Sequence, residues 1–166
     1  PVDETDPTVV FVSHASGTAE KQLEGLSDQL CELNAEMRDK VIAGVKELVG
    51  AARESFDKGN PPVMEFQWRE ALRQALGRHG VAVKGDHEQE LLNFAYMKIG
   101  DAMFRHQTLR WVRQSGFPLK VYGRGWDENP EFADCAQGVI EHGEQLRELF
   151  TRSRVSLQGT SYGNIH

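Results

Sequence analysis

Glycine, histidine and hydroxyl residues follow several predicted strands, and these are the residue types best suited to hold a ligand at a sheet edge. The segments are 13–14, 122–126, 141–142 and 158–163. Glycine lets a ligand approach the backbone closely, and exposed backbone amides bind phosphate oxygens. His14, His142 and His166 lie just beyond predicted strands, which favours contact with a ligand. Because glycine and serine are also common in ordinary turns, a binding edge and a set of plain turns both stay open.

Cofactor motifs are incomplete in this sequence. Gly123 and Gly125 follow a predicted strand, as in a dinucleotide fingerprint, but Glu128 occupies the third glycine position. Asn129-Pro130 interrupts the place where a phosphate-binding helix should begin. The six histidines show no metal-ligand spacing on one helix face, so no metal site is predicted. Trp126 fits a core aromatic and a base-stacking platform equally well.

Four short apolar segments are predicted to form the strands that position these residues. They are Val9–Val12, Leu119–Tyr122, Gly138–Glu141 and Val155–Leu157. A helix over 143–152, with Leu146, Leu149 and Phe150 facing inward, separates the last two strands. Strand, helix and strand at this spacing indicate a parallel crossover, whose strands all end at one edge of the sheet. The predicted fold class is α/β, a partial Rossmann-like parallel sheet.

The stretch of about 19–114 is predicted to be a large helical insertion between the first and second strands. Apolar residues recur every three or four positions from Leu23 to Phe56, which is typical of one apolar stripe on a single helix or on two helices in line. The residues expected to be buried there are Leu26, Leu30, Leu33, Met37 and Leu48. Further helices are predicted from Met64 to Gly80 and from Asp86 to the turn at Gly116.

Composition excludes several classes of protein. The chain has 166 residues and a net charge of −6, which argues against a nucleic-acid partner. No apolar run approaches the ~20 residues of a membrane helix, so the protein is predicted not to span a membrane. The two cysteines, Cys31 and Cys135, are far apart and are expected to be free thiols of a cytoplasmic protein. We expect one α/β domain over 1–166, a fragment of a larger protein, because the sequence has no initiator Met.

Both ends of the sequence resemble a known enzyme family. The segments that carry the resemblance are Val9 to Ser16, Leu119-Lys120-Val121-Tyr122-Gly123-Arg124-Gly125-Trp126, Gly138-Val139-Ile140, Leu146 to Ser153 and Val155 to Gln158. They are similar to the donor-binding domain of group 1, spore-maturation-protein-like glycosyltransferases of the GT-B type. The helical middle matches no motif of that family.

The resemblance implies that a nucleotide sugar is the donor substrate and that no other cofactor is needed. The residues it places around the donor are Ser13, His14, Tyr122, Gly123, Trp126, Glu141 and His142. At the sugar and phosphate end it places Gly159, Tyr162, Gly163 and His166. Arg124, with the amides around Gly123 and Gly125, would stabilise the departing diphosphate. The catalytic residues are not assigned, since the acceptor domain of such enzymes has no counterpart here, and this fragment is expected to be inactive alone.

Two functions of different classes therefore follow from the sequence. The first is the donor-binding part of a glycosyltransferase. The second is a non-catalytic interaction or regulatory module that uses the stripe from Leu23 to Phe56 as a partner surface. In either case the strand at Val155–Leu157 is expected to leave an unpaired edge, through which the chain would form a homo-oligomer.

Overall fold

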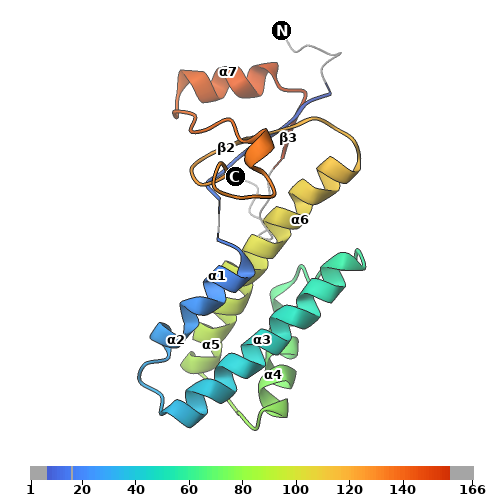
Figure 1. The fold of residues 1–166 in the computed structure, drawn as a ribbon. Coiled ribbons are helices and arrows are strands. Elements are labelled where there is room, and N and C mark those ends of the chain that lie inside the picture. Colours follow the sequence, from blue (N-terminus) through green and yellow to red (C-terminus); the bar gives the residue numbers. More distant parts are fainter. Residues whose placement is uncertain (1–6, 16, 158–166) are drawn as a thin grey trace. The chain divides into compact units, whose positions relative to one another are not determined.

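The computed structural model describes residues 7–15 and 17–157 (Figure 1). These residues form two compact units. The sheet unit comprises 7–15 and 106–157, and the helical unit comprises 17–105. The boundary falls within helix α6 (Asp101–Gln114), between Arg105 and His106. Among the described residues, no helix combines the length and the apolar character needed to cross a membrane.

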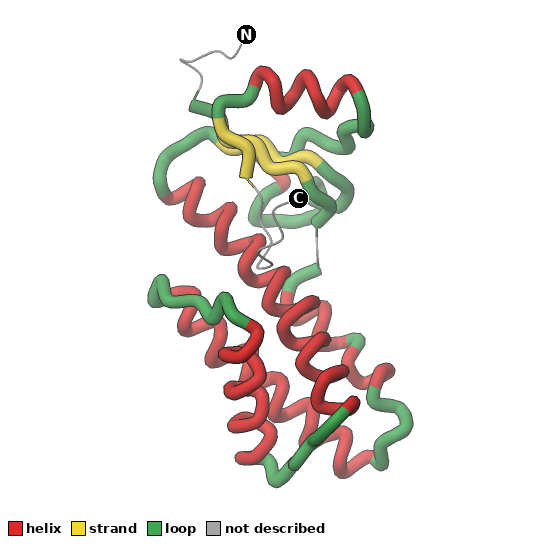
Figure 2. Tube along the Cα trace, turned by 180° about the vertical axis from the view of Figure 1, so that it is seen from behind, coloured by secondary structure: helices red, strands yellow, loops and turns green. Residues whose placement is uncertain are grey.

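The sheet unit contains a parallel sheet of three strands, seen in yellow in Figure 2. Its strands are β1 (Val9–Val12), β2 (Leu119–Tyr122) and β3 (Val155–Leu157), in the order β2-β1-β3. Val9 is in register with Leu119 on one side and with Val155 on the other. The fold is therefore α/β, and the prediction of three parallel strands at these residues is confirmed.

The strand predicted at Gly138–Glu141 is wrong. The backbone that lies beside β2 comes slightly earlier in the chain, where Ala136 forms a parallel bridge with Val121. Gln137 N–H donates to the Val121 carbonyl at 2.8 Å, and Gly123 N–H donates to the Gly138 carbonyl at 2.8 Å. Gly138 has a φ of 77°, a left-handed conformation that ends the extended run. Val139 to Glu141 consequently form a loop that leads to α7 (Glu144–Arg152).

Helix α7 lies along one face of the sheet, but none of its residues is fully buried (Figure 1). Leu146 and Leu149 are half-buried, whereas Phe150 is 44% exposed, so the prediction that Phe150 faces inward is wrong. β3 is an outer strand among those described, and its Val155 is 42% exposed. Association of two copies through this edge stays a prediction.

The opposite face of the sheet carries the core of this unit. Phe11, Val121 and Trp126 are buried there together with Leu109 from the second half of α6. Short helix η2 (Ala133–Cys135) follows Phe132, which is also fully buried. Half of α6 thus supplies the apolar layer against which the sheet packs.

The helical unit is a set of helices joined by short turns. They are α1 (Ala19–Glu24), α2 (Leu26–Gln29), α3 (Ala35–Asp57), α4 (Glu65–Arg78), α5 (Asp86–Leu92), the π-helix η1 (Asn93–Gly100) and the start of α6. Asn34 caps α3, its side chain accepting the Met37 N–H at 2.9 Å, and Thr18 caps α1 in the same way. Gly80, with a φ of 70°, ends the turn after α4.

The apolar stripe predicted over 19–56 is buried only in part. Leu26 and Leu48 lie in the core, as predicted. Leu30 and Leu33 are half-buried, and Met37 is 37% exposed, contrary to expectation. The reason is that this segment forms three helices, α1, α2 and α3, and not one helix or two in line. The breaks at 25 and 30–34 interrupt the helical phase, and the stripe leaves the core between α2 and α3.

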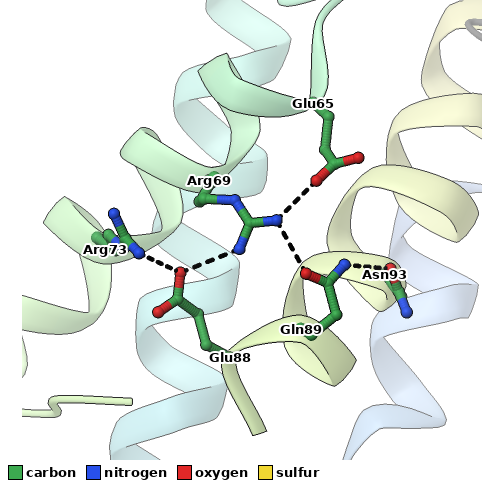
Figure 3. Close-up of polar contacts among 6 residues, drawn as sticks. All are labelled: Glu65, Arg69, Arg73, Glu88, Gln89 and Asn93. Atoms are coloured by element: carbon green, nitrogen blue, oxygen red, sulfur yellow. Dashed lines mark hydrogen bonds and ion pairs between the residues drawn. The ribbon is translucent and has the colours of Figure 1, made fainter. Parts of the chain in front are cut away.

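A buried carboxylate ties α4 to α5. Glu88 is 5% exposed, and its Oε1 forms ion pairs with Arg73 at 2.8 Å and with Arg69 at 3.3 Å (Figure 3). Arg69 also donates to Gln89 at 2.9 Å, and Gln89 donates to Asn93 at 2.9 Å. The network therefore runs from α4 through α5 to the first residue of η1, and it pairs the only charge that α5 buries.

Two glycines allow close packing between helices of this unit. A Cβ on Gly44 of α3 would lie 2.8 Å from Leu76 Cδ2 and 3.2 Å from Leu76 Cα on α4. A Cβ on Gly100 would lie 2.8 Å from Cζ2 of Trp68, a fully buried side chain. The backbones of α3 and α4 approach closely because residue 44 has no side chain.

We predict opposite effects of the same substitution at two glycines of α3. Gly44→Ala should lower the free energy of unfolding by about 1–3 kcal/mol, because the new methyl group overpacks against Leu76. Gly50→Ala should raise it by about 0.5–1 kcal/mol, because nothing lies within 4 Å and alanine favours the helix. Urea unfolding followed by circular dichroism measures both. Equal effects of the two substitutions would contradict the close packing of α3 on α4.

Candidate functional site

The loops after β1 and β2 are bonded to one another at the carboxyl edge of the sheet. Ser13 N–H donates to the Tyr122 carbonyl at 2.9 Å, and Ala15 N–H donates to the Arg124 carbonyl at 2.9 Å. The amide of Arg124 donates to Nδ1 of His14 at 3.1 Å. Because Nδ1 accepts this bond, the neutral ring carries its proton on Nε2. The structure therefore places Ser13 and His14 beside the backbone of residues 122–124.

Gly123 is the tightest point of this contact. Its φ is 138°, and a Cβ there would lie 2.1 Å from the Ser13 carbonyl oxygen. No side chain fits at this distance, so the β1 and β2 loops meet backbone to backbone. Gly125 also has a positive φ, 83°, and a Cβ there would lie 3.3 Å from that of Ala15. Both glycines allow the β1 loop to pack closely against the β2 loop. This packing leaves less of their backbone accessible to a ligand.

Trp126 belongs to the core. Its side chain is fully buried, and its Nε1–H donates to the Ser13 carbonyl at 2.5 Å. The indole ring makes edge contacts with Phe11 and Phe132 at centroid distances of 5.8 and 5.7 Å. Of the two interpretations that the sequence left open, the structure selects the core aromatic, because a buried ring offers no face for a base.

The segment before α7 adds two more predicted residues to the same edge. Gly138 is bonded to Gly123, so the chain leaves the sheet beside the β2 loop. Glu141 and His142 follow it and are exposed. Helix α7 connects the carboxyl end of the segment at 136–138 to the amino end of β3. Since β3 is parallel to the other strands, the helix begins at the carboxyl edge of the sheet. Exposed charges and the first amides of α7 thus share one edge of the sheet.

Salt bridges join α6 to the loop that follows Trp126 and leads to the backbone at 136–138. The guanidinium of Arg110 binds both carboxylate oxygens of Glu131, at 2.5 and 2.8 Å. Arg113 binds both oxygens of Asp134, at 3.1 and 2.9 Å. Such paired contacts fix direction as well as distance. The loop that precedes Gly138 is therefore firmly positioned.

Cys135 lies directly before that segment and is not suited to act as a nucleophile. Burial raises the pKa of its thiol above the usual value, with a further contribution from the Asp134 charge. Its Sγ donates to the Phe132 carbonyl at 3.2 Å. A raised thiol pKa lowers the fraction of reactive thiolate near neutral pH.

A cationic pocket on the other face of the sheet was missed by the sequence analysis. It has a volume of about 350 Å³ and lies between the strands and α7. Lys120, Arg152 and Arg154 line it together with Tyr122 and one acid, Glu148, which lies 3.8 Å from Arg152. Tyr122 therefore faces this pocket rather than the loops. The alternation in β2, with Lys120 exposed between buried Leu119 and Val121, is the signal that could have revealed the second face.

Four predicted site residues cannot be placed. Gly159, Tyr162, Gly163 and His166 lie outside the described residues. Over 7–15 and 17–157, no three His, Cys, Asp or Glu side chains are placed to hold a metal ion. No family model, curated protein or solved structure matches this chain.

We predict that Gly123→Ala destabilises the sheet unit far more than Gly138→Ala does. Both glycines have a positive φ, but a Cβ at Gly138 meets nothing within 4 Å. Gly138→Ala should cost about 1 kcal/mol from its backbone conformation alone. Gly123→Ala should cost about 3 kcal/mol or more, because the Ser13 carbonyl must also move. Urea unfolding followed by tryptophan fluorescence gives both values, and similar losses would contradict the contact between the two loops.

Proposed function

We infer that the sheet unit is the donor-binding part of a nucleotide-sugar-dependent glycosyltransferase of the GT-B type. The observation that carries this proposal is the order of the parallel segments. The backbone at 136–138 lies beside β2, so the order across the sheet is 136–138, β2, β1, β3. Numbered by their order along the chain, these four parallel segments follow one another as 3-2-1-4. This is the order of the first four strands in a Rossmann-like sheet, which binds nucleotides at its carboxyl edge.

In this proposal the helical unit is a large insertion between the first two strands of a Rossmann-like domain. Such a domain normally has a single crossover helix before its second strand. The second half of α6 occupies that position, since its Leu109 packs in the core with Phe11 and Val121. Residues from 17 to about 105 are then additional to the nucleotide-binding framework.

The exposed groups at the carboxyl edge suit a nucleoside diphosphate. Arg124 is exposed at the end of β2, and its cation would offset the charge that develops on the leaving diphosphate. Glu141 is exposed beside His142 and would accept hydrogen bonds from ribose hydroxyls. The first amides of α7 lie at the same edge and favour phosphate oxygens. The two free thiols, Cys31 and Cys135, support a reducing compartment, and we place the protein in the cytoplasm.

The test is thermal unfolding of the 166-residue chain with UDP, GDP, CDP or ADP. One of these should raise the melting temperature, because a ligand at 100 times its Kd stabilises the folded state by about 2.7 kcal/mol. Glu141→Ala should weaken that ligand about tenfold, as expected for a lost hydrogen bond to a charged group. Glu70→Ala is the control, since Glu70 is also exposed but lies on α4.

Two results would count against the proposal. If none of the four nucleotides shifts the melting temperature, the donor-binding function is wrong for this chain. If a nucleotide binds and Glu141→Ala leaves its affinity unchanged, Glu141 is outside the site and the rest of the proposal stands.

A non-catalytic interaction module is the second candidate function. A specific observation favours it, namely that the apolar stripe of residues 23–56 is left partly uncovered where Leu30, Leu33 and Met37 leave the core. This candidate concerns the helical unit only and does not depend on the nucleotide proposal.

A further inference from the structure

An apolar groove runs across the helical unit between α2, the start of α3, and η1. We call it the α2–η1 groove, and its volume is about 720 Å³. Its floor is made of core side chains, among them Leu26, Val41 and Phe94, each at most 4% exposed. Two methionines form its rim, Met37 at 37% and Met97 at 47% exposed. A deep apolar floor with flexible methionines at the rim is typical of surfaces that accept apolar side chains from a partner.

The segment that runs from the end of α1 to the start of α3, along one side of the groove, is rich in acidic residues. Between residues 22 and 39 the sequence has a single basic residue, Arg38. The acidic residues of the same stretch are Glu24, Asp28, Glu32, Glu36 and Asp39, and all of them are exposed. Glu32 lines the groove itself, and Glu90 of α5 lines it as well. Glu32 and Glu90 thus face one lysine of the lining, Lys98, and His87 lies 3.7 Å from Glu90, so the acids of the lining outnumber its lysine and arginine residues.

One lysine also lines the groove, on the η1 wall that faces α2 and α3. Lys98 Nζ lies over the ring of Phe94, 5.7 Å from its centroid. In this position the ammonium group covers an aromatic ring on its own helix. Among the acids near the groove, Glu36 pairs with Lys40 at 2.6 Å and Glu90 lies 3.7 Å from His87. Glu32 has no ion pair within the part of the chain that the structure describes.

The groove wall opposite α2 and α3 is formed by the π-helix η1. Phe94, Met97 and Lys98 all project from this helix into or beside the groove. π-Helical turns are rare, are less favourable than α-helix, and occur frequently at functional sites. Here both ends are fixed, by Gln89 bonded to Asn93 and by Gly100 packed against Trp68. The wall is thus held in place before any partner arrives.

We propose that the α2–η1 groove binds a basic amphipathic helix of a partner protein. Leucine-type side chains of that helix fill the floor, and its lysine or arginine residues face Glu32 and the acids beside it. A second copy of this chain fits less well. Its exposed amphipathic helix, α7, carries Glu144 and Glu148 as well as Arg147 and Arg152, and the whole chain has a net charge of −6. Charge complementarity therefore selects a basic partner.

The test uses the full 166-residue chain and a fluorescently labelled amphipathic peptide made only of leucine and lysine. We expect saturable binding in fluorescence anisotropy, weakened by added NaCl because the rim charges are exposed. Met97→Glu should weaken binding at least about tenfold by placing a charge on the apolar rim. Phe66→Glu is the matched control and should leave binding unchanged, since Phe66 is 68% exposed and does not line the groove.

Glu32→Lys should also weaken binding, and Glu70→Lys, an exposed acid outside the groove, should have little effect. Circular dichroism of each variant checks that it is folded. A peptide of leucine and glutamate with the same pattern should not bind.

Several outcomes would overturn the proposal. Equal binding of the leucine–glutamate peptide, or equal loss with Met97→Glu and Phe66→Glu, would show unspecific adhesion. Binding of dodecylamine without binding of the peptide would make the groove a site for a small cationic amphiphile. A concentration-dependent dimer in sedimentation that Met97→Glu abolishes would assign the groove to a second copy of the chain.

Discussion

The carbonyl group of Ser13 organises the carboxyl edge of the sheet unit. It accepts the indole N–H of Trp126, and it occupies the space that a side chain at position 123 would need. The Gly123 amide in turn donates to the Gly138 carbonyl. The Ser13 carbonyl is thereby linked, through Gly123, to the segment beside β2. Because these contacts are made by backbone and by a buried ring, they cannot be shifted without moving β1, β2 or the core.

This constraint separates supporting residues from groups that are available to a ligand. Gly123, Gly125 and Trp126 hold the edge together, and their contacts are with the protein itself. Arg124 and Glu141 are exposed on the same edge. A rigid backbone that carries a few exposed charges is the arrangement that favours precise positioning of a polar ligand, because little conformational entropy remains to be lost on binding.

Short-range patterns predicted much of the fold, and long-range packing decided the rest. The β-branched run at Val9–Val12 and the segment Leu119–Tyr122 specify strands by composition alone, and both are strands. The strand predicted at Gly138–Glu141 failed because the left-handed φ of Gly138 turns the chain there. A regular spacing of leucines did not reveal the turns between α2 and α3, and periodicity cannot distinguish a π-helix from an α-helix. The role of Trp126 required knowing which carbonyl group its N–H would reach.

The parallel pairing of β1 with β2 joins parts of the chain that are far apart in the sequence. These strands are neighbours in the sheet, yet the whole helical unit lies between them in the sequence. Bringing the ends of so long an unfolded segment together is entropically costly, and non-local pairing of this kind is slow. The helical unit is continuous in sequence over 17–105, and α1 already contacts η1 within it. Its prior folding shortens the effective loop that the sheet must close. We therefore expect that damage to the packing of the helices slows formation of the sheet, although it removes no contact of the sheet itself.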